Sequence, residues 1–507
     1  MKRYVGIILV GAMAVYGAGC SSDGGEPQEE GPIGEGTPCE DQGGSGIVRV
    51  TDDDISVDTT WSSGCDYVLN QLTYVTSPTP APASAKQADG TTLTIEAGTT
   101  IRGEQGSALI ISRGSRIIAN GTESAPIVMT SSRAEGSRAT GDWGGLAILG
   151  SAIINRGLGT CEGTGDCEDS IEGLPSQELR GRFGGDDNSS SCGSIQYTRI
   201  EFAGREVIPG NELNGLTVGG CGSGTTLDYI QVHRGLDDGV EFFGGTANIS
   251  HVITSGMGDD GLDWDQGYQG TVQNFIVHHF AGRTDDPRGI EADNFGDETN
   301  ITPRSAPTVL YGTVVADADA SHDQGIVLRR GTWGVLDGIV VEGYNSAAGI
   351  DVRDDGWDAA DGGWPTDLVV RNSCFDGNSP NYPTDVDCGG ANEEDCNDES
   401  TQNPGSFFPE DSETDGVATP ALGNLEEDPN VGDYSPAATG GTPDYSVSNP
   451  NCMGAFAGPA DGNGGNGGNG GAGGAGGDGG AAGAGGEGGT TPPGDDWTQG
   501  WTAFPVN

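Results

Sequence analysis

Residues 95–101 read IEAGTTI, and residues 111–117 read ISRGSRI. Each copy is a short β-branched strand, a glycine turn and a second short strand, and residues 126–129 (PIVM) continue the pattern. The residues that match, sixteen apart, are Ile95 with Ile111, Gly98 with Gly114 and Ile101 with Ile117. Strands this short are not stable alone. The repetition therefore predicts a solenoid in which like residues stack above like.

A second, longer repeat follows from about residue 193. Five glycines each lead into a short apolar strand, and they lie 22, 28, 36 and 24 residues apart: Gly239, Gly261, Gly289, Gly325 and Gly349. A rung of about 22 residues with loop insertions explains this scatter. A β-propeller would need four strands in every ~40–45 residues and antiparallel turns, which the chain lacks. The sequence thus predicts an all-β, single-stranded parallel β-helix.

Several of these motifs together resemble one family. They are TTW (59–61), YVL (67–69), LTIEAGTTIRG (93–103), DWGGLAILGS (142–151), YTRIEFAG (197–204), NELNGLTVG (211–219), DDGVEFFGG (237–245) and DDGLDWD (259–265). Over roughly residues 46–350 the chain is similar to bacterial surface lipoproteins with a pectate-lyase-like, right-handed parallel β-helix, most of them uncharacterised. The resemblance implies a fold and a location, and implies almost nothing about chemistry.

The first twenty residues have the pattern of an export signal. Lys2 and Arg3 precede an apolar run at 5–16, and Gly17-Ala18-Gly19-Cys20 follows. We expect residues 1–19 to be a lipoprotein signal peptide and Cys20 to carry the lipid, although Gly17 stands where such signals usually have a large aliphatic residue. The alternative is an ordinary cleaved signal. The expected location is the bacterial envelope, at the outer membrane or cell surface, with residues 20–45 as a polar tether.

The remaining chain divides by composition. Residues 46–90 are expected to cap the solenoid, and residues 91–457 to form it with long loop insertions. Residues 458–494 are a Gly-rich insertion that cannot build a core. The aromatic ending, residues 495–507, is expected to return and cover the last rung, because the resembled family keeps a G-A-F segment (454–456) close to such an ending. The alternative is a linker that carries a separate sorting signal.

Eleven cysteines are present, and ten remain once Cys20 is set aside. An even number of cysteines outside the reducing cytoplasm favours disulfides. A zinc site is disfavoured, because no two cysteines have the C-x-x-C spacing. Local pairing predicts Cys39 with Cys65, Cys161 with Cys167, Cys192 with Cys221, and two bridges among Cys374, Cys388, Cys396 and Cys452. Cys192 and Cys221 each precede a strand one rung apart, which matches the Cα spacing of a disulfide.

The formal net charge is −54. Binding to nucleic acid requires a basic face that neutralises phosphates, so nucleic acid is excluded as a partner. An acidic exterior concentrates divalent cations.

Alternation along the strands of the second repeat predicts which side chains face outward. The residues expected in the core are Val240, Leu262, Ile290, Ile326 and Ile350. The outward column is then Glu241, Asp263, Glu291, Val327 and Asp351, and beside it run Phe243, Asp265, Asp293, Arg329 and Arg353. Asp238 and Asp260, with Asp237 and Asp259 beside them, stack before the glycines. Rungs ~4.8 Å apart bring these carboxylates close enough to repel one another.

Three interpretations of the stacked carboxylates remain open. The aspartates belong to local Asp-Gly turns, in which they bond their own backbone N–H groups and glycine supplies a positive φ. Or they bind Ca²⁺ through oxygen ligands, for which the candidates are Asp238, Glu241, Asp260, Asp263, Asp265 and Glu291. Or they act in acid–base catalysis, with Asp238, Asp260, Asp263 and Arg329 as candidates and Arg353 as a further basic residue. His233, His278 and His279 are interpreted as hydrogen-bonded turn residues.

These interpretations give three functional hypotheses. The first is a non-catalytic surface protein that binds carbohydrate or cell-surface partners, with Ca²⁺ stabilising the acidic column. The second is a polysaccharide lyase or glycoside hydrolase that uses the clustered aspartates on the outward face. The third is a structural component of the cell envelope.

Overall fold

The computed structural model describes residues 46–76, 90–156, 167–208, 211–281, 287–296, 300–353, 367–379, 431, 443–448, 452, 454–455 and 496–505. The expected signal peptide, Cys20, the tether and the Gly-rich insertion lie outside these residues, and so do Cys39, Cys161, Cys388 and Cys396. Within the described part, no helix has the length and apolar character needed to cross a membrane.

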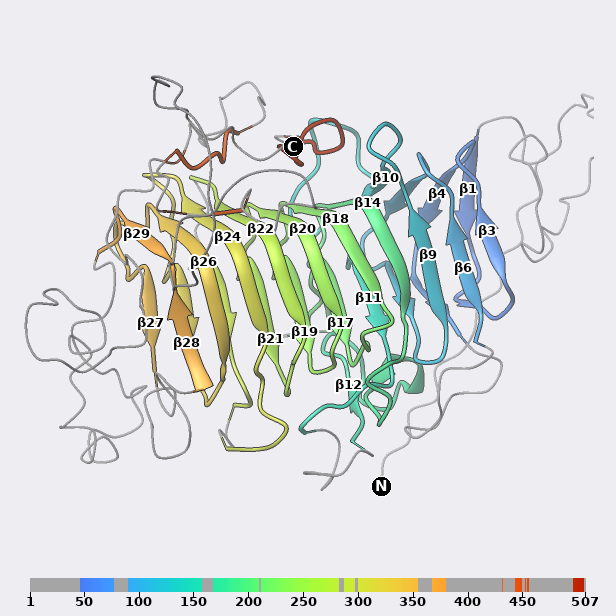
Figure 1. The fold of residues 1–507 in the computed structure, drawn as a ribbon. Helices are drawn as coiled ribbons and strands as arrows, with labels where there is room; N and C mark the ends of the chain where they lie inside the picture. The colour runs from blue at the N-terminus through green and yellow to red at the C-terminus, as the bar shows by residue number, and fades with distance from the viewer. Residues whose placement is uncertain are drawn as a thin grey trace, which may run out of the picture. The chain divides into compact units, whose positions relative to one another are not determined.

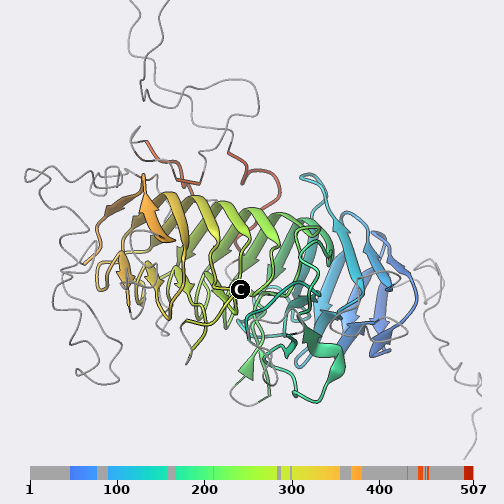
Figure 2. The same ribbon diagram turned by 60° about the horizontal axis from the view of Figure 1, so that its bottom comes forward.

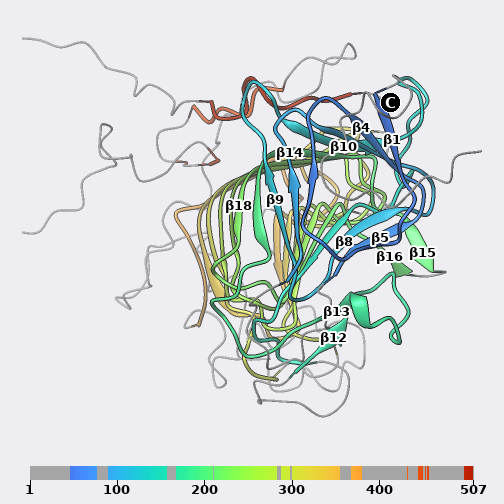
Figure 3. The same cartoon turned by 90° about the vertical axis from the view of Figure 1, so that its right-hand side faces the viewer.

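The first rungs consist of three short parallel strands each, and equivalent strands stack into three ladders (Figures 1 and 3). One ladder contains β1 (Ile47–Val50), β4 (Asp66–Leu69), β7 (Thr100–Gly103) and β10 (Ile127–Ser131). The second begins with β2 (Asp54–Ile55), β5 (Leu72–Val75), β8 (Ala108–Ile111) and β11 (Leu146–Leu149). The third contains β3 (Thr59–Trp61), β6 (Thr92–Ile95) and β9 (Arg116–Asn120).

From β14 (Gly193–Glu201) onward, the first and third ladders fuse, because one long strand pairs with both β9 and β10. The long strands that follow are β18 (Thr226–His233), β20 (Asn248–Ser255), β22 (Thr271–His279), β24 (Thr308–Ala316) and β26 (Gly334–Glu342). The next rung is again split, into β28 (Leu368–Arg371) and β29 (Cys374–Asp376). A residue with positive φ bends most long strands near the middle, such as Tyr197 at 45° and Tyr229 at 55°.

The second ladder continues unfused along the solenoid and is called the second sheet below. Its later strands are β17 (Leu216–Gly219), β19 (Val240–Phe243), β21 (Leu262–Asp265), β23 (Ile290–Ala292), β25 (Ile326–Leu328) and β27 (Ile350–Val352). Each pairs in parallel with the one before it. The predicted fold, a right-handed parallel β-helix, is therefore confirmed, as is the rung of about 22 residues with insertions.

One expectation about the first rungs is wrong. The sixteen-residue repeat does not stack, because Ile95 lies in β6 and Ile111 in β8, two strands of different ladders. Gly98 lies in the turn between β6 and β7, and Gly114 in the turn between β8 and β9. The strand that stacks on β6 is β9, in which Arg116 is the partner of Thr92. Residues 46–76, the described part of the expected cap, consist of rungs of the same kind, since β1 to β5 pair in register with β4 to β8.

A segment inserted between rungs lies against the outer face of the second sheet (Figure 2). This covering segment, residues 167–187, contains β12 (Asp169–Ser170), the single 3-10 turn η2 (Leu179–Gly181) and β13 (Arg182–Phe183). Its Ile171, Leu174 and Phe183 join a buried cluster with residues such as Tyr74 and Ile110 on the sheet. A small hairpin, β15 (Glu206–Ile208) and β16 (Asn211–Glu212), follows β14.

The C-terminal strap, defined as the described residues of 443–455 together with 496–505, runs along the fused sheet. Trp501 packs edge-on against Tyr197 and Tyr229, whose rings are stacked with centroids 4.3 Å apart. Arg199 donates to the Trp501 carbonyl, 3.1 Å away. The aromatic ending thus returns to the solenoid, but it lies on the side of the middle rungs and not over the last one.

Two disulfides have both of their cysteines among the described residues; one lies within the solenoid, and the other joins the strap to it. Cys192 and Cys221 are bonded with Cα atoms 5.8 Å apart, which confirms the predicted pair. Cys374 is bonded to Cys452, so the strap is covalently attached to β29. Cys65 and Cys167 are also disulfide-bonded.

Candidate functional site

The middle rungs of the second sheet place the predicted outward column as alternation requires. Thr217, Glu241, Asp263, Glu291, Val327 and Asp351 are consecutive partners in the parallel register. Val240, Leu262 and Ile290, one position before them, are at most 1 % exposed and face the core. The column was predictable because a buried aliphatic residue after each glycine fixes the direction of its neighbour.

Asp238 and Asp260 bind backbone groups of the next rung and not of their own turns. Asp238 Oδ1 accepts the N–H of Asp260 at 2.8 Å, and Asp260 Oδ1 accepts the N–H of Arg288 at 2.7 Å. These three residues hold the same place before Gly239, Gly261 and Gly289. For Asp238 and Asp260 the interpretation as a local Asp-Gly turn is therefore wrong, since each carboxylate links its rung to the next. Asp237 does bond locally, to the N–H of Asp238.

The glycines of this column do not adopt a positive φ either. A Cβ at Gly239 would lie 2.5 Å from the Gly261 carbonyl oxygen, and one at Gly261 would lie 2.7 Å from that of Gly289. Glycine is required here because successive rungs approach too closely for any side chain.

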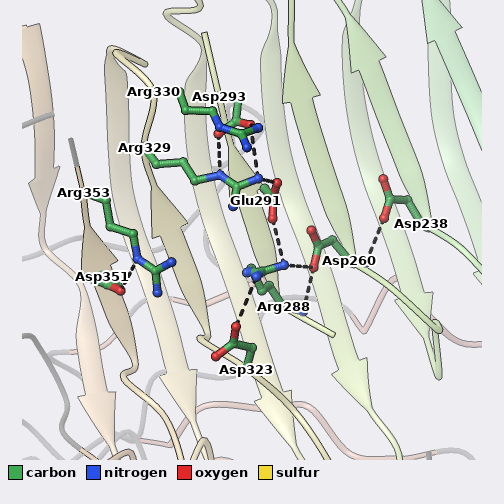
Figure 4. A network of polar contacts seen from close by, with 10 residues as sticks. All are labelled: Asp238, Asp260, Arg288, Glu291, Asp293, Asp323, Arg329, Arg330, Asp351 and Arg353. Atoms are coloured by element: carbon green, nitrogen blue, oxygen red, sulfur yellow. Dashed lines mark hydrogen bonds and ion pairs between the residues drawn. The ribbon is translucent and has the colours of Figure 1, made fainter. Parts of the chain in front are cut away.

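Toward the C-terminal rungs of the second sheet, at β23, β25 and β27, arginines form ion pairs with the acidic side chains of the column (Figure 4). Arg288 contacts Glu291 at 2.9 Å and Asp323 at 3.1 Å. Arg329 contacts Glu291, and its Nε lies 2.8 Å from Asp293 Oδ1. The two remaining pairs are Arg330 with Asp293 and Arg353 with Asp351, each at 2.7 Å. Burial, followed by the nearby Arg330 and Arg288, lowers the pKa of Arg329 to about 10.

On the N-terminal side, the carboxylates have far less compensation. Oxygens of Asp238, Glu241 and Asp263 all lie within 4.8 Å of one another, and so do those of Asp237, Asp238 and Asp259. Oδ1 of Asp263 is buried and has no hydrogen-bond partner among the described residues. Asn214, 1 % exposed, donates through Nδ2 to Glu241, whereas its Oδ1 is likewise buried without a described partner. We call Asp238, Glu241 and Asp263 the acidic cluster.

A third carboxylate group, Asp260, Asp263 and Glu291, joins the acidic cluster to the arginines. Asp260 and Glu291 are already contacted by Arg288, so this group has a cation from the protein itself. Asp265, the sixth predicted metal ligand, accepts the N–H of Gln266 and is in none of the described groups that could hold an ion. The structure thus brings together five of the six candidates and separates Asp265 from them.

Burial is the main electrostatic fact about the acidic cluster. It raises the pKa values of Asp238, Glu241 and Asp263 well above their usual range, and neighbouring carboxylates add to the effect. It also raises the pKa of Asp237 to about 8 and that of Asp265 to about 7. Groups so perturbed either hold protons or need a cation beside them.

Sequence reasoning missed two residues at this site. Glu172, from the covering segment, lies next to Glu241 and Asn214 and is itself shifted to a higher pKa, mainly by burial. Arg288 directly precedes Gly289 of the longer repeat. Its rung position, equivalent to Asp238 and Asp260, could have identified it, whereas no repeat contains Glu172.

The predicted turn histidines lie elsewhere. His233 ends β18 and His278 and His279 end β22, all on the fused sheet and all at most 2 % exposed. His278 is hydrogen-bonded to Tyr445 and Asp317, each at 3.0 Å. None of the three is near the acidic cluster in the register.

The family follows from a comparison of the whole sequence. A model of the pectate-lyase-like beta helix domain matches residues 79–404, most of the chain. The chain belongs to this family. No match was found among curated proteins or among solved structures. Family membership agrees with the stacked rungs and the fused ladders. It assigns no chemistry to the acidic face of the second sheet.

Proposed function

We propose that the protein is a non-catalytic surface β-helix that binds carbohydrate and holds a Ca²⁺ ion at its acidic cluster. The observation that carries the metal is Asp263 Oδ1, a buried carboxylate oxygen without a described partner beside two other carboxylates. Ca²⁺ takes six to eight oxygen ligands and needs no nitrogen or sulfur. Asp238, Glu241 and Asp263 would hold the ion, and its charge would stabilise their ionised forms.

The adjoining arginines support a binding role over a lyase. In a lyase, Arg329 would have to act as a base. Its guanidinium instead contacts both Glu291 and Asp293, and since burial lowers its pKa only to about 10, it keeps its proton at neutral pH. A row of cations next to a Ca²⁺ site suits the carboxylate or sulfate groups of an acidic polysaccharide. We further propose, from the N-terminal sequence, that lipid on Cys20 attaches the protein to the outer surface of the bacterial envelope.

The metal is tested by thermal unfolding of the secreted body in EDTA and in Ca²⁺. At a Ca²⁺ concentration 100 times Kd, the native state gains about 2.7 kcal/mol, and we expect Tm to rise by roughly 5 °C. Asp263→Asn should lose most of this rise. In EDTA it should be at least as stable as the wild type, because it removes a buried like charge.

Glu135→Gln is the matched control, since Glu135 is an exposed acid outside the site. It should show the full Ca²⁺ effect. An equal Ca²⁺ effect in the Asp263→Asn variant, or none in the wild type, contradicts the site.

Carbohydrate binding is tested by electrophoresis through gels that contain acidic or neutral polysaccharides. We expect retardation by at least one acidic polysaccharide, weakened several-fold by EDTA and by Arg353→Gln. If no polysaccharide of a broad panel retards the protein, the proposed carbohydrate binding is wrong, whereas the proposed metal site is unaffected. An increase in unsaturated-product absorbance that Arg329→Gln abolishes would establish the lyase instead.

A further inference from the structure

Histidines are concentrated under the C-terminal strap. His233 Nε2 lies 2.9 Å from the Pro505 carbonyl oxygen, and His278 Nδ1 lies 3.0 Å from the Tyr445 hydroxyl. The ring of His251 meets that of Trp497 edge-on, with centroids 5.2 Å apart. Three of the five histidines of the chain thus contact this one segment.

His233 is enclosed by aromatic rings from both the solenoid and the strap. It is 1 % exposed, and the rings around it belong to Phe202, Phe280 and Phe504, with centroids 5.8 to 6.2 Å away. Phe504 and Pro505 come from the strap, so the docked strap is what closes this site on one side. Detachment of residues 496–505 would admit water to the imidazole.

The bond to Pro505 places a proton on Nε2 of His233. The Pro505 carbonyl can only accept, so Nε2 carries the proton and donates to it. Nδ1, 2.8 Å from Ser255 Oγ, then accepts from the hydroxyl. A second proton on this ring would create a buried charge.

No carboxylate compensates such a charge among the described neighbours. The charged groups that face His233 are Arg199, Arg234 and His278, and all of them oppose a positive ring. Glu201 is its partner on the adjacent rung, but that carboxylate is engaged by Arg199 at 3.2 Å and lies 3.8 Å from Arg138. Burial, and secondarily these cations, lower the pKa of His233 to about 3 despite the bond to Pro505.

We propose that residues 496–505 form a proton-released latch, docked at neutral pH and detached when His233 takes up a proton. The docked ring has a depressed pKa and the detached ring an ordinary one near 6.5. Docking is therefore fully favoured above pH 6.5 and weakens as the pH falls from there toward 3. At pH 4.5 the ratio of docked to detached strap falls by about 100-fold.

Detachment uncovers an apolar strip of the fused sheet while the chain stays tethered. Ile253, Ile276 and Val315 pack in one cluster with Tyr445, Ala455 and Phe504 of the strap. The bond between Cys374 and Cys452 keeps the other end of the strap on β29. The latch is therefore reversible, and return to neutral pH restores the docked state.

His278 is not the proton acceptor that releases the strap. Burial lowers its pKa, but its Nε2 lies 3.0 Å from Asp317 Oδ1, which favours the charged ring. Its contact with the strap is Tyr445, which lies outside residues 496–505. The geometry therefore assigns the release to His233.

The strap supplies its own reporters, Trp497 and Trp501. We expect their emission to shift to the red, and acrylamide quenching to rise, between pH 6.5 and pH 4, with the signal of a Trp497→Phe/Trp501→Phe variant as the reference. The transition should take up about one proton and reverse on neutralisation. Far-UV circular dichroism should stay constant over this range, because the rungs remain folded.

His233→Gln keeps a donor for the Pro505 carbonyl but cannot gain a charge. Its transition should move at least one pH unit lower. His322→Gln is the control, since His322 bonds to Asp323 and lies away from the strap, and it should match the wild type. A wild-type signal that stays flat to pH 4 would overturn the latch, as would the same midpoint in His233→Gln. If that variant does not fold, proton uptake and reversibility in the wild type still decide the proposal.

Discussion

At the scale of single residues, the unusual property of this protein is a set of carboxyl groups with raised pKa values. Asp263 illustrates the cause. Its Oδ1 is buried, its neighbours along the column are Glu241 and Glu291, and Asp293 is the carboxylate that most raises its pKa after burial itself. Only the C-terminal half of the column has arginines. The uncompensated carboxylates are therefore confined to one part of the face, and we propose the cation there and not along all of it.

The pH dependence of stability without metal follows from these groups. A carboxyl group whose pKa is raised by folding stabilises the fold at low pH and loses that contribution as the pH rises through the folded value. With Asp265 near 7 and Asp237 near 8, we expect Tm in EDTA to fall by on the order of 5 °C between pH 6 and pH 9. Saturating Ca²⁺ should reduce the part of this slope that comes from Asp237, because a cation held beside Asp238, within 4.8 Å of Asp237, favours its ionised form. A Tm in EDTA that is constant or rises over this range would contradict the burial of charge, and scanning calorimetry decides it.

At the scale of strands and segments, local repetition predicted the middle rungs well. The apolar residue after each of Gly239, Gly261 and Gly289 set the register, and the outward column followed without error. The same logic failed at Ile95 and Ile111, because a turn motif that recurs within one coil has the same appearance as a repeat of the coil. Periodicity identifies similar local structures and does not say which of them stack.

Segments that belong to no repeat could not be placed from sequence. Glu172 reaches the site only because apolar residues such as Ile171 and Leu174 dock on the second sheet, and their partners include Tyr74, nearly a hundred positions earlier. Trp501 lies against Tyr197 for the same kind of reason. Such contacts depend on which apolar faces remain uncovered after the rungs have stacked, and that is a property of the assembled solenoid.

At the scale of the whole molecule, the strap connects rungs that would otherwise contact only their neighbours. In a solenoid, stability is approximately a sum of rung and nearest-neighbour terms, so the ends can unfold alone. The strap joins β29 through Cys374–Cys452, β24 through the Ala455 N–H bonded to Thr313, and β18 through Gln231 bonded to Ala503. It therefore couples rungs that are distant along the axis.

Removal of residues 496–507 should consequently weaken cooperativity as well as stability. Loss of Trp501, which is 1 % exposed, removes a contribution of about 3–5 kcal/mol, the usual cost of deleting a buried tryptophan side chain. Urea unfolding is followed by circular dichroism and by hydrogen exchange of the β24–β29 rungs. We expect the two curves to coincide in the full-length body. In the truncated body they should separate, with the late rungs unfolding first. The Trp501→Phe variant, which keeps the strap and most of the buried ring, should retain a single transition. A truncated body that unfolds at lower urea in one step would show that the strap adds stability without coupling the rungs.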